Sequence, residues 1–168
     1  MFVRERYVTN SSSSHSIVTN IKQNTYEDIW AGTEDGEFGW ENFLLVSADA
    51  KRLYLAVTML MMLKGYEDGE KIPLKELANT INEFFGQEII NPDADEYDYY
   101  VDHESIIGLP YDELKNLDIE ACRDFVNYVV NTPDVAITGG NDNSDESFRP
   151  VEGDYEGTWG AYKRWSKS

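Results

Sequence analysis

The segment between Phe38 and Lys64 constrains the fold more than any other part of the chain. It contains the apolar run Phe43–Val46, which has the length and composition of a buried central strand. Ser47 follows as a good helix N-cap, and apolar residues then recur at helical spacing as far as Lys64. We expect the buried face of this helix to include Leu53, Val57, Leu60 and Met61.

Two further helices are predicted by the same kind of pattern. Pro73 opens the first, which Gly86 stops, and the second spans Ile119–Asn131. Strands are expected at residues 2–8, 16–19, 97–103 and 134–138. The pattern predicts one α+β domain over residues 1–168, with three main helices packed on a mostly antiparallel sheet. Irregular acidic loops and a polar, loop-rich segment from 139 to 168, ending in an aromatic tail, complete the expected architecture.

The charge of the chain restricts what it can bind. It has 32 acidic and 14 basic side chains, a formal net charge of −18, and residues 23–50 and 76–114 contain no Lys or Arg. Non-specific nucleic-acid binding requires Lys and Arg to neutralise phosphates, so we expect no direct nucleic-acid binding.

No apolar run reaches the roughly 18 residues that span a bilayer, and the first residues lack the apolar segment of a signal peptide. Cys122 is the only cysteine, which excludes an internal disulfide, and we expect a cytoplasmic protein without membrane contact.

The two stretches without basic residues favour a basic protein as partner, because such a field speeds encounter with positive charge. The candidate interaction residues are Glu34, Asp35, Glu37, Asp93, Asp95, Glu96 and Asp98, together with Trp159 and Trp165 in the aromatic tail. The alternative is that the acidic side chains only keep the protein dispersed in solution.

Three polar segments carry residue types that could perform chemistry. The first, Asn10–Ser16, is expected as a loop between two strands. Turns rich in Ser and Asn form backbone concavities that hold anions, which makes Asn10 and Ser14 candidate ligand contacts and His15 a candidate catalytic residue. The alternative is a plain hydrogen-bonded loop.

The second segment runs from Asp102 to Ser105. His103 is a candidate general base or metal ligand, Asp102 a candidate metal ligand beside it, and Ser105 a candidate nucleophile. The alternative is a structural histidine at the surface of a sheet.

The third segment begins with Gly139 and Gly140, directly after a predicted strand. Two glycines permit a tight turn or a close approach of a ligand to the backbone, so these residues and Asn141 are candidate ligand contacts. Asp142 is a candidate ligand of a hard cation, although the spacing of acidic residues here does not match an EF-hand. The alternative is a solvated turn.

The block Arg4–Ser16, with the sequence RERYVTNSSSSHS, resembles a recurrent N-terminal signature. The signature, R-x-R-[FY]-V-[ST]-N-S-S-S-S, is found in small uncharacterised proteins encoded by bacteria and bacteriophages. This resemblance implies a phage or mobile-element setting inside a bacterial host cell, where acidic accessory proteins act on host machinery. It implies no catalytic residue.

Two functional hypotheses follow. The first is an acidic accessory protein that binds a basic host or phage protein, as a nucleic-acid-mimicking inhibitor, and it requires no cofactor. The second is an enzyme or sensor that depends on a metal or phosphate ligand, with a site built from the SSSSHS, DHES and GGNDN segments. The second hypothesis would need a divalent metal or an anion, and the residue pattern alone does not decide whether the chain is an enzyme.

Overall fold

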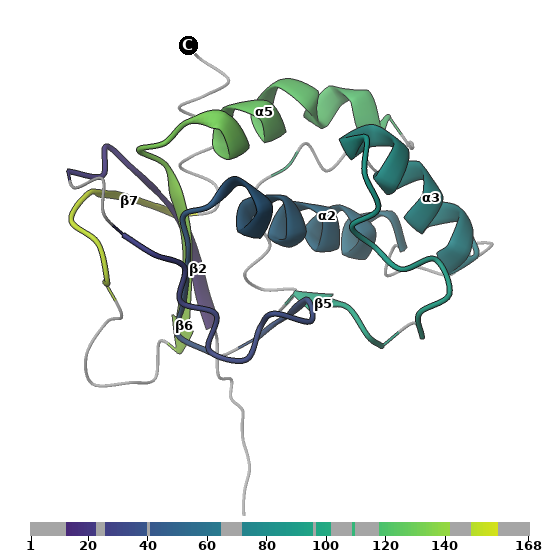
Figure 1. Cartoon of the computed structure of the whole chain (residues 1–168), viewed down its shortest axis with the longest axis horizontal. Helices are drawn as coiled ribbons and strands as arrows, with labels where there is room; N and C mark the ends of the chain where they lie inside the picture. The colour runs from purple at the N-terminus through teal and green to yellow at the C-terminus, as the bar shows by residue number, and fades with distance from the viewer. Residues whose placement is uncertain are drawn as a thin grey trace, which may run out of the picture.

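The computed structural model describes residues 13–22, 26–39, 41–64, 72–95, 97–101, 109, 118–141 and 149–157. Their strands are β2 (Ser13–Thr19), β3 (Glu37–Phe38), β4 (Phe43–Leu45), β5 (Tyr100–Val101), β6 (Ala136–Asn141) and β7 (Asp154–Gly157). Their helices are α2 (Ala48–Lys64), α3 (Leu74–Phe85) and α5 (Arg123–Asn131), the last preceded by a 3₁₀ turn, η2 (Ile119–Cys122). The predicted α+β class with three main helices is confirmed (Figure 1). The predictions for residues 2–8 and for the aromatic tail lie outside the described residues.

The main sheet has the order β4-β6-β2-β7, and all its pairs are antiparallel. A separate parallel pair joins β3 to β5. Several strand boundaries were predicted wrongly. β2 begins at Ser13 instead of residue 16, β6 spans Ala136–Asn141 instead of residues 134–138, and β5 begins at Tyr100 instead of residue 97. The two extensions pair with each other, Ser14 opposite Gly140, so long-range backbone pairing overrides the local preference of Ser, Gly and Asn for turns.

Helix α2 is the centre of the molecule and contacts α3, α5 and β5. Figure 1 shows it between α5 and β5, with the main sheet to one side. The predicted N-cap is confirmed, because the backbone N–H of Ala50 donates to Ser47 Oγ at 3.2 Å. Of the apolar residues expected at helical spacing, Val57 and Leu60 are buried and Leu53 and Met61 are half-buried, but every residue from Tyr54 to Leu60 is buried. A helix enclosed by several elements buries most of its circumference.

The two outer helices begin and end close to their sequence signals. Gly86 ends α3 in the left-handed conformation with φ +71°, and Pro73 occupies its N-cap position. The side chain of Asn82 then holds the following segment, because its Nδ2 donates to the carbonyl of Ile90 and its Oδ1 accepts from the N–H of Ile89 and Ile90. The third predicted helix starts at Ile119 as expected, but its first turn is 3₁₀.

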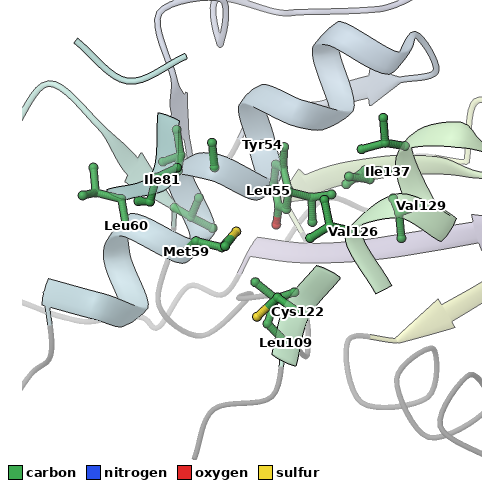
Figure 2. Close-up of a cluster of buried hydrophobic side chains, with 14 of the residues drawn as sticks. Tyr54, Leu55, Met59, Leu60, Ile81, Leu109, Cys122, Val126, Val129 and Ile137 are labelled. Carbon is green, nitrogen blue, oxygen red and sulfur yellow. The ribbon is translucent and has the colours of Figure 1, made fainter. Parts of the chain in front are cut away.

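The core has two parts, one on each face of the main sheet. Residues that alternate along the strands divide between them, with Ile17 and Ile137 facing the helices and Val18 and Ala136 facing the other side. The larger part joins the sheet to all three helices, and Figure 2 shows its side chains, including Tyr54, Leu55, Cys122 and Val126. Among the described residues, no helix has the length and apolar character needed to cross a membrane.

Candidate interaction surface

The short parallel pair of β3 and β5 brings the two stretches without basic residues together. Glu37 lies opposite Tyr100 and Phe38 opposite Val101, and the N–H of Tyr100 donates to the carbonyl of Gly36 at 3.0 Å. Phe38 and Val101 point inward and are fully buried, while Glu37 and Tyr100 are exposed. Alternation along two adjacent strands therefore places an acid and a tyrosine side by side at the surface.

Gly36 allows the second acidic segment to pack tightly on the first. Its φ of +94° disfavours any side chain, and a Cβ there would lie 2.7 Å from Cδ1 of Tyr99. The hydroxyl of Tyr99 in turn accepts the N–H of Asn91 at 2.9 Å. One tyrosine thus joins β3 to the loop that carries Asp93 and Asp95.

Several carboxylates of this loop also form local turns. The N–H of Asp95 donates to the carboxylate of Asp98 at 2.8 Å, and the N–H of Tyr97 donates to the carboxylate of Asp95 at 3.2 Å. Such side-chain to backbone bonds hold the loop in shape while leaving the charges at the surface. Asp93 also forms an exposed ion pair with Lys75, at 3.4 Å.

We call the exposed residues of this region the acidic ridge. Its tyrosines stand out among the described large hydrophobic side chains, because Tyr97 is 79% and Tyr100 is 41% exposed. The ridge consists of Glu34, Asp35, Glu37, Asp93, Asp95, Tyr97, Asp98 and Tyr100. The predicted interaction residues Glu96, Trp159 and Trp165 lie outside the described residues.

His15 is held in the core of the protein. It is only 2% exposed, its Nε2 lies 3.0 Å from the carbonyl oxygen of Gly39, and its Nδ1 lies 2.7 Å from the hydroxyl of Tyr54. Because a carbonyl oxygen can only accept, Nε2 of His15 is the donor in its hydrogen bond to Gly39. The ring also packs edge-on against Phe43. These contacts orient the ring and keep it from solvent.

The serine and glycine segments meet as the second hypothesis requires. Ser14 lies opposite Gly140 and His15 opposite Gly139, on neighbouring strands β2 and β6. Gly139 does allow other groups to approach the backbone closely, but these groups are the side-chain rings of Phe43 and His15. A Cβ on Gly139 would lie 2.2 Å from Cε1 of Phe43 and 2.8 Å from Cδ2 of His15. The structure thus explains this glycine by packing inside the sheet.

The remaining members of the second hypothesis cannot be placed. Asn10, Asp102, His103, Ser105 and Asp142 lie outside the described residues, and only the backbones of Ser14 and Asn141 are described. In the part of the chain that is described, no group of three His, Cys, Asp or Glu side chains is arranged to hold a metal ion.

Lys51, which no sequence motif singled out, is the most perturbed charged side chain of the described core. It is 1% exposed, and its Nζ donates to the carbonyls of Val135 at 2.9 Å and Thr132 at 3.2 Å, beyond the end of α5. Burial lowers the pKa of Lys51 to about 8, because desolvation outweighs the attraction of Asp28 and Asp134. The only sequence feature that could have indicated a buried lysine is its position among apolar residues of a helix, and a lysine at such a position more often faces solvent.

Comparisons with known proteins add no relative to this description. Protein-family models, curated proteins and solved structures were each searched, and none matches the chain.

Proposed function

We propose that the chain is an acidic accessory protein of a phage or mobile element, which binds a basic protein of its bacterial host or of the phage. The acidic ridge is the contact surface, and binding there competes with nucleic acid for the same partner. The observation that carries this proposal is the pairing of β3 with β5, which joins the two acidic stretches into one surface.

The chemistry of the acidic ridge suits a basic partner. Its charged members are all acidic, and nearby Lys75 forms an exposed pair with Asp93. Exposed tyrosines provide rigid apolar area and a hydroxyl, which makes them frequent anchors in protein interfaces. A surface of this kind attracts positive charge over distance and gives short-range contact once the partner arrives.

The partner is identified and tested in two steps. The untagged chain is coupled to a resin, a host lysate is applied at 0.1 M NaCl, and proteins released between 0.1 and 0.5 M NaCl are identified. The Kd of each purified candidate is then measured at both salt concentrations, alone and with competing double-stranded DNA. We expect binding to weaken at least 10-fold at 0.5 M NaCl, where the Debye length falls to about 4 Å, and to be displaced by DNA. Binding that is independent of salt and DNA contradicts the proposal.

A matched pair of variants tests whether the acidic ridge makes the contact. The ridge variant replaces Glu34, Asp35 and Glu37 by Gln, Asn and Gln. The control replaces three exposed acids elsewhere, Glu83, Asp118 and Asp124, by their amides and therefore changes the net charge equally. If each of the three contacts is worth about 0.2–1 kcal/mol, the ridge variant should bind roughly 3- to 160-fold more weakly at 0.1 M NaCl. An equal loss in both variants would show that only total charge matters.

The second hypothesis, a metal- or phosphate-dependent enzyme or sensor, is supported by one observation. The pairing of β2 with β6 places the backbone of Ser14 beside Gly140, so two of its three segments are adjacent. Thermal unfolding with EDTA, with inorganic phosphate, and with Ca²⁺, Mg²⁺, Mn²⁺ or Zn²⁺ tests it. A ligand at about 100 times its Kd adds roughly 2.7 kcal/mol of stability. Such a gain for one ligand, lost in His103→Ala or Asp142→Ala, would favour this function over the first.

A further inference from the structure

A cavity lies on the face of the main sheet away from the helices, beside the segment that enters α2. Its volume is about 460 Å³, within the range of about 300–1,000 Å³ typical of small-ligand sites. The described residues that line it are Ile21, Tyr26, Glu27, Asp28, Val46, Ser47 and Pro133. Four of these residues offer apolar surface, two are acidic, and none is basic.

Hydrogen bonds from several elements hold the walls of this cavity. The N–H of Ile21 donates to the carbonyl of Asp134 at 3.1 Å, which joins the β2 end to the turn that carries Pro133. The N–H groups of Val46 and Ser47 donate to the carboxylate of Asp28, at 2.7 and 2.9 Å. A cavity with fixed walls loses little conformational freedom when it is filled, and this lowers the cost of binding.

The two acids differ in what they can offer a ligand. The carboxylate of Asp28 accepts backbone N–H groups and also the hydroxyl of Ser47 at 2.5 Å, so its negative charge is held in a fixed position. Glu27 is exposed and able to turn toward an occupant. The nearby cation Lys51 is buried behind the wall and donates to Thr132 and Val135, so it does not line the cavity. The cavity therefore favours a positively charged group.

We propose that this cavity receives an arginine side chain of the basic partner. A planar guanidinium can stack on the ring of Tyr26 and donate to the carboxylate of Glu27, while its aliphatic stem covers Ile21 and Val46. Arginine fits better than lysine because its cation is planar and more weakly hydrated. The inference rests on the proposed function for the source of the arginine, whereas the preference of the cavity can be measured without any partner.

Amide NMR titration of the whole chain with three small probes provides the test. Nα-acetyl-arginine amide represents an arginine within a protein, and Nα-acetyl-citrulline amide has nearly the same shape without the charge. Free L-arginine represents a metabolite. We expect the arginine amide to bind at least 5-fold more tightly than the citrulline amide and to shift the amide signals of Ile21, Val46 and Ser47. Glu27→Gln should weaken this binding at least 3-fold, and the control Glu83→Gln, which removes an equal charge from the exposed side of α3, should leave it unchanged.

The outcomes separate this inference from the proposed function. Equal binding of the arginine and citrulline amides, or shifts spread over the acidic surface, would overturn the arginine site even if a basic partner binds the ridge. Tighter binding of free L-arginine by 10-fold or more would overturn the assignment to a partner protein, because the cavity would then recognise the free amino acid. Selective binding of the arginine amide supports the site, and a failed partner search would then count against the proposed function alone.

Discussion

Buried Lys51 should make the protein more stable in alkaline solution than at neutral pH. Its pKa is about 8 in the folded protein and about 10.5 when the chain is unfolded. Between these values the unfolded state binds the proton that the folded state has released, so the free energy of unfolding rises with pH. The gap of about 2.5 pH units corresponds to roughly 3 kcal/mol, complete near pH 10.5. Below pH 8 both states are protonated and the contribution no longer changes.

The assay is urea unfolding followed by far-UV circular dichroism at several pH values from 7 to 10.5. Because 11 tyrosines and the large negative charge also respond to alkali, the quantity of interest is the difference between the wild type and Lys51→Met. Methionine has a similar length and no charge, so this difference isolates the ammonium group. Lys75→Met removes a lysine whose side chain is 69% exposed and controls for the loss of one positive charge.

The expected result is that wild-type stability rises relative to Lys51→Met by about 3 kcal/mol between pH 7 and 10.5. A difference that stays constant within about 0.5 kcal/mol would refute the reasoning, because it would mean that folding does not desolvate the ammonium group of Lys51. Lys75→Met should show the same rise relative to Lys51→Met as the wild type does, since that variant retains the buried lysine.

Two further predictions concern the fold. Gly139→Ala should destabilise the protein by about 2–3 kcal/mol and lower the melting temperature by roughly 5–10 °C in calorimetry, because its Cβ meets the buried ring of Phe43. The control Gly86→Ala, at φ +71° with nothing within 4 Å of the new Cβ, should cost only about 1 kcal/mol of backbone strain. Equal losses of stability in the two variants would contradict the clash with Phe43. Ser47→Ala should cost about 1 kcal/mol in urea unfolding through loss of the α2 cap. Ser47→Asp should not recover this loss, because the neighbouring carboxylate of Asp28, which accepts the Ser47 hydroxyl at 2.5 Å, opposes the new charge.

The helices could be predicted because their signals are local. Ser47, Pro73 and Gly86 act through backbone groups within one turn of themselves, so the sequence is enough to place the start of α2 and both ends of α3. The apolar face of α2 could not be assigned in the same way, because α3, α5 and β5 all contact it and bury most of its surface. How many neighbours a helix has is decided by the whole chain.

The candidate site shows the same division. The sequence showed the acidic stretches through its composition and placed the serine and glycine segments next to predicted strands, where Ser14 pairs with Gly140 in the structure. It did not indicate that Gly139 accommodates Phe43 and His15, that Lys51 is buried, or that a cavity forms beside Asp28. Each of these depends on side chains from distant segments.

The sequence by itself therefore determined the helices, the α+β class and the strongly negative charge of this protein, since these follow from local spacing and from counting. Only the tertiary structure decided where the charge gathers. A strand was expected at residues 97–103, but the pairing of Glu37 with Tyr100 was not indicated, and it accompanies the burial of Phe38 and Val101 beneath them. Strand partners are chosen by backbone hydrogen bonds and packing between segments far apart in the chain, which no short window of sequence contains.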